Sequence, residues 1–188
     1  MRENNSGRDL AMIVGGIAVG LVGSRLLPPL AAMASGAMRG KATGDPFRKL
    51  ENDHRVILTT LRSMEQVRDN SVGKRAALFL AVKRKLAKHA MAEEDVVYPM
   101  LQDEAQRRAA AKHLYEEHAE MKVLLFEIEK CLMEDRPWTE PVSALRAMVE
   151  RHAREEEREQ FPLLRGMLTE RRFGQVAAQV HREEALVL

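Results

Sequence analysis

Four histidines and two glutamates of this chain have the residue types and the spacing of a metal site. His89 and Glu93 form a His-x-x-x-Glu pattern that His152 and Glu156 repeat, and a lone histidine precedes each of these two pairs. Residues four apart on a helix project from one stripe and differ by about 6 Å in rise, so each pair can direct two ligands at one point. The candidate metal ligands are His54, His89, Glu93, His118, His152 and Glu156.

The donor atoms of this set favour a pair of metal ions. A carboxylate has two oxygens, so we predict that Glu93 and Glu156 bridge two cations and that the four imidazoles cap them. Neutral imidazoles and carboxylates suit iron or manganese, and they do not exclude zinc. Metal would also account for the otherwise costly burial of two carboxylates inside a protein.

The same residues belong to an internal duplication. His152 follows His89 by 63 residues, and His118 follows His54 by 64. The surrounding residues keep this offset, since Glu94, Tyr98, Pro99 and Leu101 correspond to Glu157, Phe161, Pro162 and Leu164. We interpret the chain as two copies of one helix pair.

Helices must position these ligands, because the apolar residues recur with a helical period and no alternating strand pattern is present. The sequence predicts helices over about 46–69, 72–102, 104–135 and 140–168, and a short amphipathic helix after Gly174. Asp45 and Pro46 are typical of a helix start. The predicted fold is all-α, an antiparallel up-down-up-down four-helix bundle in which the four histidines lie in one layer.

The composition limits the size and the class of the protein. With 188 residues and 45% hydrophobic content, the chain can form one core of ordinary size. A formal charge of +2 gives no argument for a nucleic-acid partner, and we predict none. The single cysteine, Cys131, excludes an internal disulfide framework and a cysteine zinc cluster.

An apolar, glycine-rich segment precedes the helical part. Residues 10–27 contain one charge, Arg25, and their 18 residues are slightly fewer than the ~20 that span a bilayer. Three interpretations stay open: a membrane anchor, a cleavable signal peptide, or a helix packed on the domain or on a second copy. The excess of Lys and Arg after residue 27 would leave the bundle on the cytoplasmic side. The expected location is therefore the cytoplasmic side of the inner membrane, or the cytoplasm.

With these six candidate ligands, the chain resembles the hemerythrin-like HHE cation-binding family. The resemblance extends to Tyr98-Pro99 and Phe161-Pro162, whose prolines lie ten residues after His89 and His152. The resemblance implies a four-helix bundle over residues 45–170 that holds a non-haem di-iron centre, that is, two iron ions. It leaves residues 1–44 as an apolar N-terminal segment and residues 171–188 as an amphipathic tail.

One departure from the oxygen-carrying members of that family bears on function. Those members have an extra histidine four residues before the third-helix ligand and an aspartate in the fourth helix, where this chain has Leu114 and Glu156. His113 lies about 140° from His118 on a regular helix and could join the site only through a π-bulge or a turned-in conformation. Open metal positions predict a protein that reacts with or senses O2, peroxide or nitric oxide, and the resemblance to the family implies the stress or iron-sulfur-repair type. The alternative is a non-catalytic protein that binds or stores iron or O2.

Several neighbours of the ligands allow two interpretations each. Glu94 and Glu157 follow the ligand glutamates by one residue, and either contact ligands or face solvent. Tyr98 and Tyr115 either reach the metal site or are half-buried helix residues.

Overall fold

The computed structural model describes residues 44–68 and 71–187, and every regular element in this part of the chain is helical. The α-helices are α3 (Pro46–Glu65), α4 (Val72–Ala92), α5 (Arg108–Met133), α6 (Thr139–Glu155), α7 (Phe161–Met167) and α8 (Glu170–Leu186). Three π-helical segments adjoin them: η1 (Glu93–Val97), η2 (Met100–Glu104) and η3 (Glu156–Gln160).

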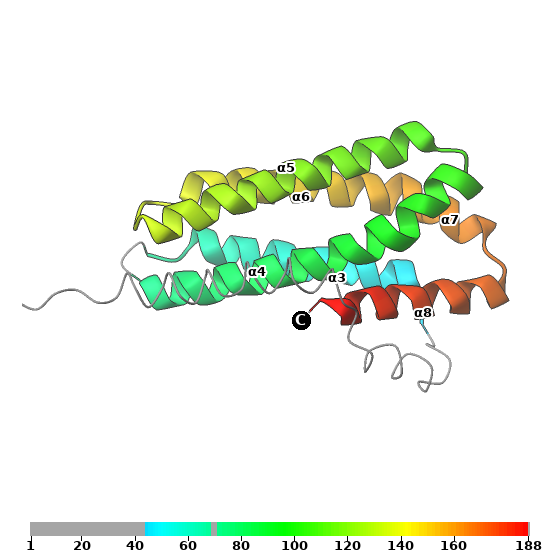
Figure 1. The fold of residues 1–188 in the computed structure, drawn as a ribbon, viewed down its shortest axis with the longest axis horizontal. Coiled ribbons are helices and arrows are strands. Elements are labelled where there is room, and N and C mark those ends of the chain that lie inside the picture. The colour runs from blue at the N-terminus through cyan, green and yellow to red at the C-terminus, as the bar shows by residue number, and fades with distance from the viewer. Residues whose placement is uncertain (1–43, 69–70, 188) are drawn as a thin grey trace, which may run out of the picture.

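Long helical rods pack side by side in the bundle (Figure 1). The rods are α3, α4 with η1 and η2, α5, and α6 with η3 and α7. α3 packs against α4 and α6, and α5 packs against the same two helices from the other side. The fifth helix, α8, folds back along α4, η1 and α3. The predicted all-α four-helix bundle with a C-terminal helix is confirmed.

The helix boundaries differ from the predicted ones by a few residues. α3 begins as predicted, since the Asp45 carboxylate accepts from the backbone N–H groups of Phe47 and Arg48. It ends at Glu65, four residues before the predicted end. α5 begins at Arg108 instead of about 104, because Gln106 has a φ of 55° and this left-handed conformation cannot continue a helix.

The π-helical segments follow from the two prolines. Pro99 and Pro162 have no backbone N–H, so each removes one hydrogen bond from the α-helical ladder. Next to these prolines, the N–H of Tyr98 donates to the carbonyl of Glu93, and the N–H of Phe161 donates to the carbonyl of Glu156. These hydrogen bonds span five residues, which widens the helix directly after each His-x-x-x-Glu pattern.

The histidine layer separates two hydrophobic clusters. One cluster includes Ile57, Leu86, Met121 and Val149, each three residues from one of the histidines and toward the same end of the bundle. The other cluster fills the opposite end and includes residues from α3, α5 and α8: Phe47, Leu50, Leu114, Val176 and Val180. The predicted layer is thus enclosed by apolar side chains above and below.

The predicted anchor, residues 10–27, lies outside the described residues. Among the helices of residues 44–68 and 71–187, none has the length and apolar character that crossing a membrane requires.

Candidate metal centre

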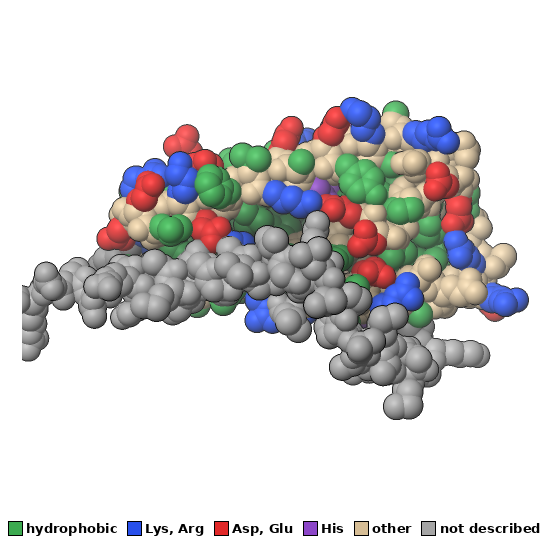
Figure 2. Space-filling view, viewed as in Figure 1, with side chains coloured by type: hydrophobic (Ala, Val, Ile, Leu, Met, Phe, Trp, Pro, Cys, Tyr) green, Lys and Arg blue, Asp and Glu red, His purple; other side chains and the backbone are tan. Residues whose placement is uncertain are grey.

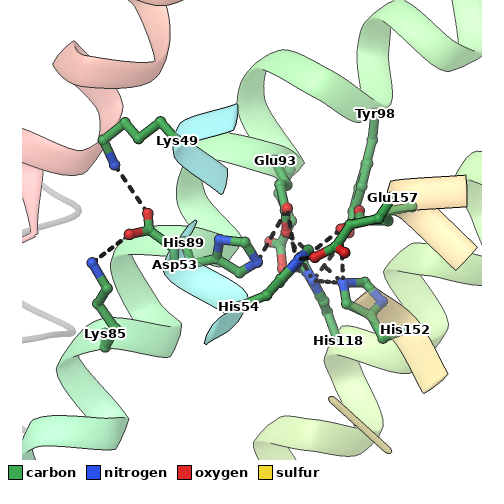
Figure 3. A network of polar contacts seen from close by, with 12 residues as sticks. Lys49, Asp53, His54, Lys85, His89, Glu93, Tyr98, His118, His152 and Glu157 are labelled. Atoms are coloured by element: carbon green, nitrogen blue, oxygen red, sulfur yellow. Dashed lines mark hydrogen bonds and ion pairs between the residues drawn. The ribbon is translucent and has the colours of Figure 1, made fainter. Parts of the chain in front are cut away.

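The six side chains predicted as ligands converge at the centre of the bundle, where Figure 3 labels the four histidines and Glu93. α3 supplies His54, α4 supplies His89, α5 supplies His118 and α6 supplies His152, while Glu93 and Glu156 begin the π-helical segments η1 and η3. None of the six is more than 3% exposed.

The histidines form two pairs with the carboxylates between them. The rings of His54 and His89 lie 4.5 Å apart between centroids, and Nε2 of His118 lies 3.2 Å from Nε2 of His152. Glu93 lies 3.1 Å from His89 Nε2 and 3.4 Å from His118 Nε2, so it faces both pairs. Glu156 likewise faces both, at 3.2 Å from His54 Nε2 and 3.4 Å from His152 Nε2.

These side chains fit a metal site, because several of their buried nitrogen and oxygen atoms lack a hydrogen-bond partner. Buried polar groups normally find hydrogen-bond partners, and each exception requires an explanation. Here the buried atoms without a hydrogen bond of acceptable geometry include His54 Nε2, His89 Nε2, both carboxylate oxygens of Glu93 and Oε2 of Glu156. Ligand atoms from five of the six residues also lie within 4.8 Å of one another. The cluster can therefore bind metal ions.

A second set of carboxylates lies within hydrogen-bond distance of Nδ1 of three of the histidines. Glu157 lies 2.9 Å from Nδ1 of His54, and Glu94 lies 3.0 Å from Nδ1 of His118. Sequence analysis left Glu94 and Glu157 either in contact with the candidate ligands or facing solvent, and contact with the candidate ligands is correct. Such contacts fix the ring orientation and leave Nε2 as the donor to a metal.

Glu117 is a further residue of this kind that sequence analysis missed. Its Oε2 lies 2.9 Å from Nδ1 of His152, and its side chain is buried. The internal duplication carried a weak signal, because Glu117 precedes the lone histidine of its copy as Asp53 precedes His54.

Tyr98 also reaches the centre. Its side chain is fully buried, and its hydroxyl lies 3.0 Å from Nε2 of His118 and 3.1 Å from Oε1 of Glu156. Tyr115 instead donates to the backbone carbonyl of Glu94 and is partly exposed. Tyr98 is thus the tyrosine that faces the metal centre.

The metal-free centre holds protons that a metal must displace. Burial lowers the pKa of His54, but the carboxylates of Glu156 and Glu157, 3.2 Å and 2.9 Å from its two ring nitrogens, outweigh burial and raise that pKa to about 9. Burial also lowers the pKa of His152, but Glu156 and Glu117 together raise it well above its usual value. For His89, burial prevails and lowers the pKa to about 3.

The two remaining histidines of the described residues lie apart from this centre. α5 is α-helical throughout, so His113 points away, about half exposed, with Nε2 3.8 Å from Glu117 and 3.7 Å from Glu155. His181 is exposed on α8. The structure shows no π-bulge that would bring His113 to the six ligands.

A groove connects the centre with the surface between α4 and α5. It has a volume of about 900 Å³, and all four ligand histidines contribute to its lining. The other lining residues are largely apolar, and Lys83 and Lys122 stand at its margin, paired with Glu129 and Glu94. Figure 2 shows histidine atoms within a face of mixed apolar, basic and acidic side chains. Small molecules can reach the ligands by this path.

The fold and the site together define a metal-binding protein of the four-helix-bundle class, with its donors inside the bundle. Comparison with known families places it further: the Hemerythrin HHE cation binding domain matches residues 45–164, and the chain belongs to this family. No curated protein and no solved structure gives a significant match.

Proposed function

We propose that the six residues hold two iron ions and that this non-haem di-iron centre reacts with or senses O2, peroxide or nitric oxide. The observation that carries the proposal is the convergence of four buried imidazoles and two buried carboxylates with unsatisfied atoms, on a groove that opens to the surface. The all-nitrogen-and-oxygen donor set suits iron, although manganese and zinc are chemically acceptable. Bound iron would supply one-electron redox chemistry and a position where a small oxidant can bind.

The protein residues have separate tasks in this proposal. Each histidine pair would hold one ion, and Glu93 and Glu156, which each face both pairs, would offer carboxylate oxygens to the two ions. Tyr98 keeps its phenol proton beside the centre, where its hydroxyl donates to Oε1 of Glu156. Its pKa lies well above the usual value, because burial and the carboxylates of Glu156 and Glu93 disfavour the phenolate. The two hydrophobic clusters exclude bulk water from either side.

The arrangement favours a reactive centre over a reversible carrier of O2. Leu114 is fully buried one turn before His118, and His113 is on the surface, so the described residues place four histidines at the centre. Four histidines leave positions on the metals that small molecules can occupy.

The test uses the purified, fully reduced protein loaded with iron without air. Its optical spectrum is recorded before and after addition of O2, peroxide or nitric oxide, and again after evacuation. We expect a change with at least one oxidant that evacuation does not reverse. A stable oxygenated spectrum that disappears under vacuum would support the alternative function, reversible O2 binding or storage. No spectral change with any of the three would contradict the proposed function.

A further inference from the structure

The internal duplication makes the two halves of the metal centre comparable residue by residue. We call the candidate metal position beside His54 and His89 the α3–α4 position. The candidate metal position beside His118 and His152 is the α5–α6 position. Offsets of 64 and 63 residues relate the first pair to the second. Two identical halves would bind two metal ions with equal intrinsic affinity. A difference between corresponding residues beside the two positions therefore points to a difference in metal affinity.

The lone histidines are equivalent in both position and support. His54 is held by Glu157 at 2.9 Å, and His118 is held by Glu94 at 3.0 Å. Glu157 corresponds to Glu94 in the duplication. Each lone histidine therefore has a carboxylate from the other copy on its Nδ1.

The histidines of the two His-x-x-x-Glu patterns differ in their support. His152 is held by Glu117 at 2.9 Å, and the equivalent of Glu117 is Asp53. Asp53 is one methylene shorter, and its oxygens are bound by Lys49 at 3.0 Å and Lys85 at 2.5 Å (Figure 3). His89 Nδ1 is buried without a hydrogen bond to any described side chain.

A second difference gives the same half an oxygen donor, because the Tyr98 hydroxyl would be free to contact the ion once metal takes Nε2 of His118. Tyr98 places a hydroxyl 3.0 Å from Nε2 of His118, whereas its equivalent, Phe161, stacks on the ring of His54 with centroids 6.1 Å apart. Phenylalanine has no atom to offer a metal or its ligands. The α5–α6 position thus has two carboxylate-held histidines and a tyrosine, and the α3–α4 position has one carboxylate-held histidine.

We propose that the two metal positions are unequal: the α5–α6 position fills first and holds its ion tightly, and the α3–α4 position is the exchangeable one. The proposal rests on the proposed metal-binding function. Carboxylates that hold ligand histidines typically change metal affinity 10–100-fold, because they fix the ring and raise its basicity. The protein would then pass through a stable one-metal form, and it could carry two different metals.

The test is a Zn²⁺ titration of the full metal-free chain against a chromophoric chelator, with native mass spectrometry to count bound ions. Zn²⁺ is used because it undergoes no redox change. We expect two steps whose affinities differ at least tenfold, with the one-zinc species predominant at one equivalent. Filling of both positions together, without a one-zinc species, would overturn the inequality while leaving the metal site itself intact. Absence of zinc binding would instead reject the proposed function.

Three variants assign the steps to positions. Glu117→Gln keeps the side-chain size but removes the charge at His152, so it should weaken the tighter step about 10–100-fold. Glu157→Gln makes the same change at His54 and should weaken the looser step only. Glu127→Gln on α5 is the control, since Glu127 pairs with Lys130 and belongs to neither group of side chains that could hold a metal among the described residues. Helical circular dichroism confirms folding of each variant. A Glu117→Gln protein with an unchanged tighter step would overturn the proposal.

Discussion

At the scale of single residues, sequence spacing could predict the side chains whose place in the metal centre follows from their position along one helix. It could not predict contacts that depend on how two helices pack. The repeated His-x-x-x-Glu spacing and the two lone histidines identified all six converging residues. Glu117 and Tyr98 were harder to predict. Glu117 acts on His152 across a helix interface, and the packing of α5 on α6 sets that contact. Tyr98 lies about 140° from Glu93 on a regular α-helix, and the π-helical η1 brings it toward the same side.

His118 and His113 give a paired test at this scale, because they lie on one helix but on different faces. His118→Ala removes a ligand atom from the centre and should abolish the optical bands of the iron pair. His113→Ala should leave iron content and spectrum nearly unchanged, since that side chain is about half exposed and points away from the ligands. The measurement is iron analysis with an absorption spectrum. Loss of the bands in the His113 variant would show that this histidine belongs to the centre.

At the scale of elements, the helical period identified the rods, but their ends depended on backbone details. The end of the second rod and the start of α5 are set by the positive φ of Gln106, which residue preferences alone do not indicate. The prolines at 99 and 162 each remove a hydrogen bond from their helices, and the π-helical segments η1 and η3 lie next to them. The predicted C-terminal helix is α8, and its packing against α4 could not be predicted because it depends on the assembled bundle.

α8 contributes to stability and supplies none of the six ligands. Val180 is fully buried in the cluster that contains Phe47 and Leu101. Val180→Ala should lower the free energy of unfolding by about 2 kcal/mol, because it removes two buried carbon groups. Metal content should stay the same. Chemical denaturation measures the difference, and His181→Ala on the exposed face of α8 is the control, with an expected change within about 0.5 kcal/mol. Equal effects of the two substitutions would show that α8 is not packed as described.

At the scale of the whole molecule, folding and metal binding are linked. The metal-free protein gathers four imidazoles and two carboxylates in its interior, so we expect metal removal to lower the melting temperature. The two hydrophobic clusters remain without metal, and the protein should stay helical.

The stability of the metal-free protein should depend on pH in the alkaline range. The pKa of His54 is raised from 6.5 to about 9, so its protonated form stabilises the folded state. This contribution is fully present below pH 6.5 and is lost as the pH rises through about 9. Denaturation of the metal-free protein at several pH values in this window measures the loss. The metal-loaded protein should lack it, because its histidines hold metal in place of protons. A metal-free protein equally stable across the window would contradict the assigned proton.

The central claim, that these six side chains hold a pair of iron ions, is tested most directly by iron analysis of the purified full chain beside its Glu93→Ala/Glu156→Ala variant. Both proteins are loaded with iron without air, freed of excess and compared by iron per chain and by helical circular dichroism. The account predicts close to two iron ions per chain in the unaltered protein and almost none in the variant, with both proteins helical. Retention of two iron ions by the helical double variant would contradict it.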